Sequence, residues 1–514
     1  MATITDRRWW ALGAVTLAVL AVGLDITVLS VALPTLATSL HASESDLQWF
    51  SSAYTLVLAA AMLPAGLLGD RYGRKTVLLV SLALFGAGSA ACAYAPSAGA
   101  FLVARLALGL AGAGVIVMAV SALTVLFSRE ERPRAVAVWA AANFLAMPIG
   151  PILGGWLLTH SWWGWIFLVN LPVAVLGLVA VAVLVPQSRS PDRPAFDPVG
   201  VVVSSAGLAA LTYGLIEAGQ HGWNGSAALG PILGGLAALV GFLLWERHLP
   251  TGRSLIDLSL FRSASFTAGV ALVTVGTLAL VGVLFTMPQY FQGVVGTDAM
   301  GSGLRLLPLI AGFLVGLAPA ARLARLVGAR IAVAIGFAVL AAGWIVGATT
   351  SVESTAAFVA AWMATAGVGF GLLFATAAST ALSELSADRS GVGSAVLQAL
   401  KNTGAPLGAA ILGSVLSSAY RANLHLAGLP PAAPGAVEAS VFGGLVVARQ
   451  LHSAGLLESV RVAFVHAVDV ALAVSAAVAL GGVLIALLFL PGRTAAGEPD
   501  REPTGQGDRR AVAR

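Results

Sequence analysis

Two charged residues stand inside stretches of sequence that are otherwise apolar. Asp25 lies in LAVLAVGLDITVLSVALP, and Arg105 opens the string RLALGLAGAG. A charged side chain is costly in lipid, so each should face the protein interior or a water-filled cavity and find a partner there. Burial and a neighbouring cation act on the pKa of a carboxylate in opposite directions, which lets such a group carry protons near neutral pH. The two residues therefore predict proton coupling, with Arg105 tuning Asp25.

Simpler interpretations exist, and other polar residues compete for the same role. A hydrogen bond between helices would explain Asp25, and an arginine near the end of a span can extend its side chain to the membrane surface. Glu217, near the outer end of a later apolar run, is a third candidate for proton coupling, although the wet membrane surface explains it more simply. Weaker candidates for polar groups in a cavity are Ser52, Gln398, Lys401, Asn402 and Asp469.

The glycine-rich loop GLLGDRYGRK has a composition that favours contact between helices. Glycine permits close helix contact, and an aspartate can dock on a helix N-terminus because the partial positive charge there attracts a carboxylate. We expect a gate at the inner membrane surface, formed by Gly66, Asp70, Arg71, Gly73 and Arg74. The alternative is an ordinary basic loop.

A second string, AMPIGPILGG, predicts tight packing of one helix. Gly150 and Gly154 are four residues apart and share a face, with Gly155 beside them, and small residues at this spacing let helix backbones approach closely. Pro148 and Pro151 each remove a backbone hydrogen bond and can bend the helix. A generic packing helix would have a similar composition.

These residues must be positioned by membrane-spanning helices, because the chain is too apolar for a water-soluble protein. Its 514 residues are 58% hydrophobic and 10% charged, with a mean hydropathy of +0.91. A span needs about 20 mostly apolar residues. We find fourteen such runs, and the expected fold is therefore all-α and polytopic. The runs cover residues 9–34, 47–69, 77–95, 101–127, 135–159, 165–185, 199–219, 227–245, 264–291, 303–321, 331–349, 355–382, 392–418 and 464–490.

Basic residues mark one side of the membrane. With the N-terminus inside, 22 of the 28 Lys and Arg residues fall in cytoplasmic segments. This pattern predicts that both termini are cytoplasmic, and it explains the net charge of +5 without a nucleic-acid partner. The first run could pass for a signal peptide, but it is long and further runs follow, so we expect an uncleaved helix. The single cysteine, Cys92, excludes an intramolecular disulfide.

Internal similarity divides the chain into two halves. The loop GLLGDRYGRK has a counterpart in ARLARLVGAR, and MPIGPILGG has one in APLGAAILGS, each at the equivalent place in two sets of six runs. Repeated halves of this kind are common in transporters. We expect a cytoplasmic N-terminus (1–8), a six-helix bundle (9–186), a linker with an inserted helix pair (187–262), a second six-helix bundle (263–490) with an extracellular loop (419–463), and a disordered cytoplasmic tail (491–514).

Four motifs in this order resemble the major facilitator superfamily, in its fourteen-helix drug:proton antiporter branch. They are LDITVLSVALP, GLLGDRYGRK, RLALGLAGAG and AMPIGPILGG. The resemblance implies two pseudo-symmetric bundles, proton coupling or cation recognition at Asp25, and docking of Asp70 on the helix that starts near Gly391. The chain departs from the family pattern at Leu108 and Ala146. Some relatives carry acids in the second helix, where this chain has serines, which puts recognition of multiply charged cations in doubt.

The resemblance implies a proton-coupled efflux antiporter that exports amphipathic, cationic or neutral drugs and antiseptics by alternating access. We expect a monomer in the bacterial inner membrane, with small amphipathic substrates, protons and the bilayer as partners. No cofactor is expected beyond the proton gradient, and the GxxxxGK[ST] string of nucleotide-driven pumps is absent. The alternatives are a dedicated exporter of one metabolite or antibiotic and, in a different class, an intramembrane enzyme or sensor. An enzyme is disfavoured because the HExxH string is also absent.

The extracellular loop allows two interpretations. Its segment VEASVFGGLVVARQL is apolar enough to form a short amphipathic hairpin at the membrane surface, where it would shield the outer mouth of the cavity. A disordered loop is the competing interpretation.

Overall fold

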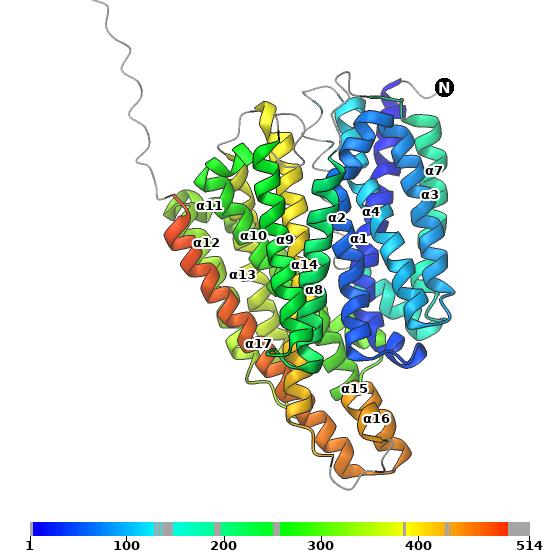
Figure 1. Ribbon diagram of the computed structural model, residues 1–514, viewed down its shortest axis with the longest axis vertical. Helices are drawn as coiled ribbons and strands as arrows, with labels where there is room; N and C mark the ends of the chain where they lie inside the picture. Colours follow the sequence, from blue (N-terminus) through cyan, green and yellow to red (C-terminus); the bar gives the residue numbers. More distant parts are fainter. Residues whose placement is uncertain are drawn as a thin grey trace, which may run out of the picture.

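The protein consists of helices gathered into two bundles, as the computed structural model shows (Figure 1). The structure describes residues 4–127, 149–189, 197–249, 258–383, 387–426 and 433–491, together with the isolated residues 131, 135, 146 and 430. In Figure 1 the dark-blue start of α1 lies at the upper right and the red end of α17 at the upper left, and we name this end of the molecule the terminus end. The opposite end carries α15 and α16, and we name it the α16 end.

The first bundle and the inserted pair precede the second bundle along the chain. The first bundle contains α1 (Ile4–Ser39), α2 (Glu44–Tyr72), α3 (Arg74–Ala93), α4 (Ala98–Leu126), helical residues 149–160, α6 (Trp165–Leu168) and α7 (Asn170–Leu184). The pair is α8 (Pro198–His221) and α9 (Ser226–His248). The second bundle contains η1 (Leu258–Arg262), α10 (Ala264–Gln289), η2 (Tyr290–Val294), α11 (Ala299–Val327), α12 (Ala329–Gly347), α13 (Ala356–Ser383), α14 (Ala387–Ala422), α15 (Ala433–Ala439), α16 (Val441–Gln450) and α17 (Ala454–Phe489).

The apolar runs coincide with these helices. Within the described residues, eleven helices are long and apolar enough to cross a membrane, and α2 adds a twelfth span that is bent by 48° between Met62 and Pro64. The thirteenth run lies on α14. The fifth run is described as continuous helix only from residue 149, and its earlier part, including Pro148, lies outside the described residues except at Ala135 and Ala146. The predicted tail after residue 491 lies outside them as well.

The loop repeat between the halves appears in the backbone. Gly73 joins α2 to α3 with a φ of +109°, and Gly328 joins α11 to α12 with a φ of +86°. Side chains with a Cβ rarely adopt positive φ, so glycine is the residue that allows this sharp reversal. Gly66 is less important for close helix contact than predicted, because a Cβ there would meet Val117 at an ordinary van der Waals distance of 3.6 Å. A Cβ at Gly69 would overlap the end of the Met118 side chain. A side chain at Gly69 would therefore require the end of the Met118 side chain to move.

The predicted loop 419–463 is mostly helical. The helix α14 continues to Ala422, α17 already begins at Ala454, and α15 and α16 form the hairpin that the apolar segment predicted. The predicted thirteenth and fourteenth spans are shorter than the helices, because an apolar run ends at a charged residue such as Arg421 or Arg461. Helices continue past such residues where the membrane gives way to water.

The inserted pair is attached to the second bundle by serine hydroxyls near the α16 end. Ser414 Oγ of α14 donates to the Leu215 carbonyl oxygen of α8, and Ser418 Oγ donates to the Gly219 carbonyl oxygen at 3.3 Å. Gly219 allows this approach, because a Cβ there would lie 2.5 Å from Ser414 Cα. The outer half of α8 is thus fixed on α14.

We expect Ser414→Ala to lower the free energy of unfolding by about 1 kcal/mol, the upper part of the range for hydrogen bonds between membrane helices. Ser475→Ala is the matched control, because Ser475 is equally buried but donates to Ala471 within its own helix. Thermal unfolding of both variants in the same detergent checks the prediction. Equal losses would show that the contact between α8 and α14 contributes nothing.

Candidate functional site

The two buried charges contact each other. Arg105 on α4 donates from Nη1 to Asp25 Oδ2 on α1, and both side chains are 1% exposed. Arg105 Nε also donates to the Phe50 carbonyl oxygen at 3.3 Å. Asp25 Oδ1 has no hydrogen-bond partner among the described residues. The carboxylate therefore has one oxygen engaged by a cation and a second one open to a proton, and the surface position considered for Arg105 is excluded by its burial.

Glycines of the string RLALGLAGAG set the position of Arg105. A Cβ at Gly109 would collide with the Tyr54 carbonyl oxygen, and one at Gly112 would lie 2.8 Å from the Tyr54 hydroxyl. These glycines let α4 lie directly on α2, one turn after Arg105. The Arg105 guanidinium consequently lies over the Tyr54 ring, 4.4 Å from its centre, where a cation is attracted by the face of the ring.

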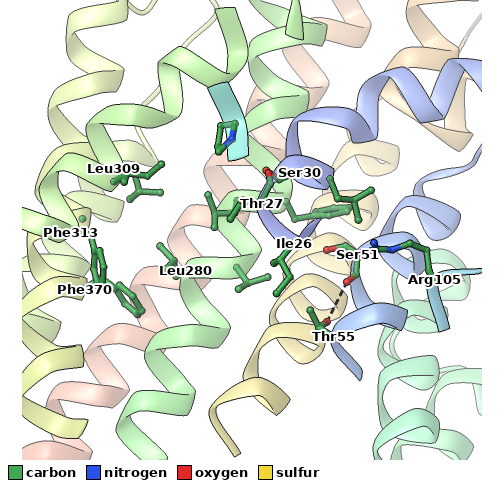
Figure 2. A pocket seen from close by; sticks show the side chains of 17 residues that line it. Ile26, Thr27, Ser30, Ser51, Thr55, Arg105, Leu280, Leu309, Phe313 and Phe370 are labelled. Atoms are coloured by element: carbon green, nitrogen blue, oxygen red, sulfur yellow. Dashed lines mark hydrogen bonds between the residues drawn. The ribbon is translucent and has the colours of Figure 1, made fainter. Parts of the chain in front are cut away.

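A cavity between the bundles begins at Arg105 of this pair, whereas Asp25 lies behind it and is not a lining residue, and the two walls of the cavity differ in chemistry (Figure 2). The first bundle supplies Arg105 and hydroxyl groups. The wall from the second bundle has no charged side chain among its described residues. The first wall consists of Ile26, Thr27, Leu29, Ser30, Ser51, Thr55, Arg105 and Pro151, and the second of Leu280, Val281, Leu284, Phe285, Leu309, Ile310, Phe313, Gly367 and Phe370. Such a cavity suits a molecule with one polar or charged part and one apolar part.

The helix of residues 149–160 packs between the bundles through its glycines. Gly150 and Gly154 face α1, where a Cβ at Gly154 would lie 2.8 Å from Val28 Cγ1. Gly155 faces α11 in the other bundle, where a Cβ would lie 2.7 Å from the Ala299 carbonyl oxygen. The shared face predicted for Gly150 and Gly154 is confirmed. The string thus contacts the helix of Asp25 on one side and the opposite bundle on the other.

Hydrogen bonds hold the bundles together at the α16 end. Gln292, in the π-helical turn η2, donates to the Val31 carbonyl oxygen at 3.0 Å, and Gln289 donates to Glu44 at 3.2 Å. Glu44 is buried at the start of α2. Glu44 is not among the predicted site residues, because the apolar run that predicts this span starts at residue 47. The capping pattern of Ser43 and Asp46 marks the true start of the helix.

The cavity is too small for a drug in this conformation. Its free volume is about 60 Å³, whereas pockets for drug-sized ligands measure roughly 300–1,000 Å³. The bundles must therefore move apart before such a molecule can enter. The contacts at the α16 end are among those that must break when the cavity opens on that side.

Only part of the predicted gate lies within the described residues. Asp70 accepts hydrogen bonds from Arg74 at 2.9 and 3.1 Å, and Arg71 lies exposed over the Tyr72 ring. The helix α14 starts at Ala387, before the predicted Gly391. The predicted docking of Asp70 falls on residues 384–395, whose side chains lie outside the described residues.

The remaining candidates do not line the cavity. Glu217 pairs with His221 at 2.6 Å on α8, and Ser52 lies next to Ser51, which does line it. Asn402 donates to Met62 Sδ at 3.1 Å across the bundles. Gln398 is half-buried one turn before Asn402, Lys401 lies 5.9 Å from the centre of the Phe374 ring, and Asp469 is half-buried on α17.

The chain matches one protein family and several named proteins over most of its length. The Major Facilitator Superfamily model matches residues 15–409. The chain is 33% identical over 488 residues to the multidrug efflux pump LfrA of Mycolicibacterium smegmatis, covering 93% of this chain and 96% of that protein. It is 31% identical over 510 residues to the tetracenomycin C resistance and export protein of Streptomyces glaucescens, covering 97% and 93%.

Solved structures agree on the fold. A bacterial homologue of the human lysosomal transporter Spinster, in an inward-facing and unoccupied conformation, matches with a TM-score of 0.68 at 16% identity. The match covers 96% of this chain and 99% of that chain. At this identity the likeness concerns the fold alone.

Proposed function

The chain belongs to the Major Facilitator Superfamily, and from that premise we propose that it exports amphipathic drugs in exchange for protons. The observation that carries the proposal is the buried Asp25–Arg105 pair beside the central cavity. The drug-efflux names of two relatives that match nearly the whole chain support the direction of transport and the class of substrate.

In the proposed cycle, Asp25 exchanges a proton for its contact with Arg105. Protonation removes the negative charge that Arg105 faces, so the guanidinium retains only the Phe50 carbonyl oxygen and the Tyr54 ring. A cationic substrate binds more tightly when the carboxylate is ionised than when it is protonated, because the electrostatic attraction depends on the negative charge. Proton binding on the outside then favours substrate release, and proton loss on the inside favours substrate binding.

Each proton that enters down a membrane potential of 100 mV supplies about 2.3 kcal/mol. For a neutral substrate that energy supports a gradient of roughly 50-fold, because about 1.4 kcal/mol corresponds to a factor of ten. Exchange of one proton for one monovalent cation moves no net charge, so it is driven by the pH gradient, or by the potential when a second proton enters. The cycle needs no nucleotide and no cofactor. We propose that Asp25 and Arg105 perform the coupling, and that Ser51 and the other hydroxyl groups of the first wall orient the substrate.

The proposed location is the bacterial cytoplasmic membrane, with the terminus end facing the cytoplasm. The positive-inside distribution of Lys and Arg supports this orientation. We propose a monomer as the working unit, since both walls of the cavity come from one chain. Glycine contacts, as at Gly155, allow the two bundles to separate and close without a partner subunit.

A dedicated exporter of one compound is the second candidate. Two relatives are named for a single natural product: the tetracenomycin C export protein and, at 31% identity over 420 residues, a probable actinorhodin transporter of Streptomyces coelicolor. Growth inhibition of cells with and without the protein, across cationic dyes, antiseptics and antibiotics, separates the candidates. Protection against several unrelated compounds supports the drug exporter, and protection against one supports the second candidate.

Everted membrane vesicles test the transport reaction itself. With an inward-acidic proton gradient, vesicles that contain the protein should take up a cationic dye such as ethidium, and a protonophore should stop the uptake. Vesicles without the protein are the control. Uptake that persists after the gradient collapses would contradict proton exchange.

A further inference from the structure

A groove separates part of the inserted pair from both bundles. It measures about 1320 Å³ and is bounded by α2, α8, α9, η1 and α14. The helices α8, α9 and α14 lie together at the centre of Figure 1. The lining comes from the portions of α8 and α9 next to the terminus end, such as Val201 and Arg247. The groove therefore lies at the depth of one membrane leaflet, the leaflet next to the chain ends.

The groove exists because α8 is fixed at one end only. Near the α16 end, the Ser414 and Ser418 hydroxyls hold α8 against α14. At the terminus end, α8 and α9 are joined to each other instead. Trp245 Nε1 on α9 donates a hydrogen bond to Asp197 Oδ2 at 3.0 Å, and Asp197 is the N-cap residue of α8. The first half of α8 is thus held by α9 and leaves room beside α14.

The lining is apolar along its length and basic at one end. Leucine, valine, alanine and phenylalanine side chains from four helices form the long wall, among them Leu208, Phe242 and Leu400. At the terminus end lie Arg247 and Arg262, both exposed, and neither is in an ion pair with any residue that the structure describes. Glu246 also lines the groove, but it is 3% exposed and has an interaction of its own.

We propose that this groove is a binding site for one anionic glycerophospholipid. The acyl chains lie along the apolar wall, and the phosphate lies between the Arg247 and Arg262 guanidinium groups. Arginine matches phosphate geometry with paired hydrogen bonds, and basic side chains at the membrane surface attract anionic lipids. A cationic amphiphile would meet two positive charges at the same place, so the groove is not an entry route for the exported drug.

The bound lipid would connect three parts of the fold. Ala60 belongs to α2 of the first bundle, Leu400 to α14 of the second, and Leu208 to the inserted pair, and all three line the groove. The inserted pair then serves to build a lipid site across the line where the bundles meet. This inference stands apart from the proposed export reaction, because it does not involve Asp25 or the central cavity.

Native mass spectrometry of the purified full-length protein tests the site. After delipidation, phosphatidylglycerol and phosphatidylcholine with identical acyl chains are added back separately. We expect one phosphatidylglycerol to bind more tightly than phosphatidylcholine. Arg247→Gln/Arg262→Gln should weaken phosphatidylglycerol binding by roughly 30-fold, taking the usual contribution of one basic residue near an anionic membrane for each arginine.

Two further variants complete the test. Arg322→Gln/Arg330→Gln removes two arginines at the same end of the protein but outside the groove, and should leave binding unchanged. Ala60→Phe fills the groove and should displace the lipid while both arginines remain. Equal binding of the two lipids, or undiminished binding to the Arg247→Gln/Arg262→Gln variant, would overturn the proposal. So would displacement of phosphatidylglycerol by tetraphenylphosphonium, which would mark a route for cations.

Discussion

Asp25→Asn is expected to abolish proton-driven uptake of dye into everted vesicles, with a loss on the order of 100-fold, the lower part of the range for removing a proton-transferring side chain. Asparagine keeps the size of aspartate but cannot take up or release a proton. The pH change that accompanies dye movement should vanish with it, which a pH-sensitive probe in the vesicle lumen measures. A variant that transports normally with unchanged proton dependence would show that Asp25 is not the coupling acid.

The variant needs a control for folding, because it leaves Arg105 buried without its carboxylate. Breaking one side of a buried ion pair costs about 3–5 kcal/mol of stability, whereas removing both charges costs far less. We therefore expect Asp25→Asn/Arg105→Gln to melt closer to the parent protein and still to lack proton coupling. Asp25→Glu, which retains the acid, should recover part of the transport. Recovery of coupling in the double variant would point to another acid.

Gly155→Ala is expected to reduce export by about tenfold or more while the protein stays folded. The added methyl would lie 2.7 Å from both the Ala299 carbonyl oxygen and Met300 Cα. These are backbone atoms of the opposite bundle, which cannot move aside as a flexible side chain can. Overpacking of this kind typically costs 1–3 kcal/mol, and here the cost falls on the conformation in which the bundles touch at the α16 end.

Gly13→Ala is the matched control, because no atom of the described residues lies within 4 Å of a Cβ at Gly13. Both changes replace a helical glycine and should raise helix propensity alike. In a Cys92→Ser background, Ala299→Cys reports opening of the α16 end, since Ala299 is buried and its carbonyl oxygen lies against Gly155. Gly155→Ala should label faster with a maleimide at that cysteine. Wild-type export and labelling would show that the contact at Gly155 does not control closure.

The number and order of the spans could be predicted because lipid imposes a simple rule. A helix that crosses a bilayer needs a long apolar run, and those runs coincide with helices throughout the described residues. The ends of the helices were harder to predict, because the rule applies only to the part of a helix that lies in lipid and not to the part that lies in water. Thus α17 begins at Ala454, before Glu458 and Arg461, although the apolar run begins later.

Within the site, charge was easier to predict than packing. A buried aspartate and a buried arginine stand out against apolar sequence, and their contact follows from the cost of leaving either alone. Tyr54 was missed because an aromatic residue in an apolar helix has no signal that distinguishes a cation's partner from ordinary core. The choice between Gly66 and Gly69 depends on where Met118 of α4 lies, which is a matter of tertiary packing.

The two unlike walls of the central cavity bear on how resistance evolves. Substitutions on α10, α11 or α13, at positions such as Leu284 or Phe370, change the shape offered to a compound and leave Asp25 and Arg105 as they are. Under the proposed mechanism, selection by a new toxin can therefore reshape one half of the protein while the proposed coupling residues of the other half stay unchanged.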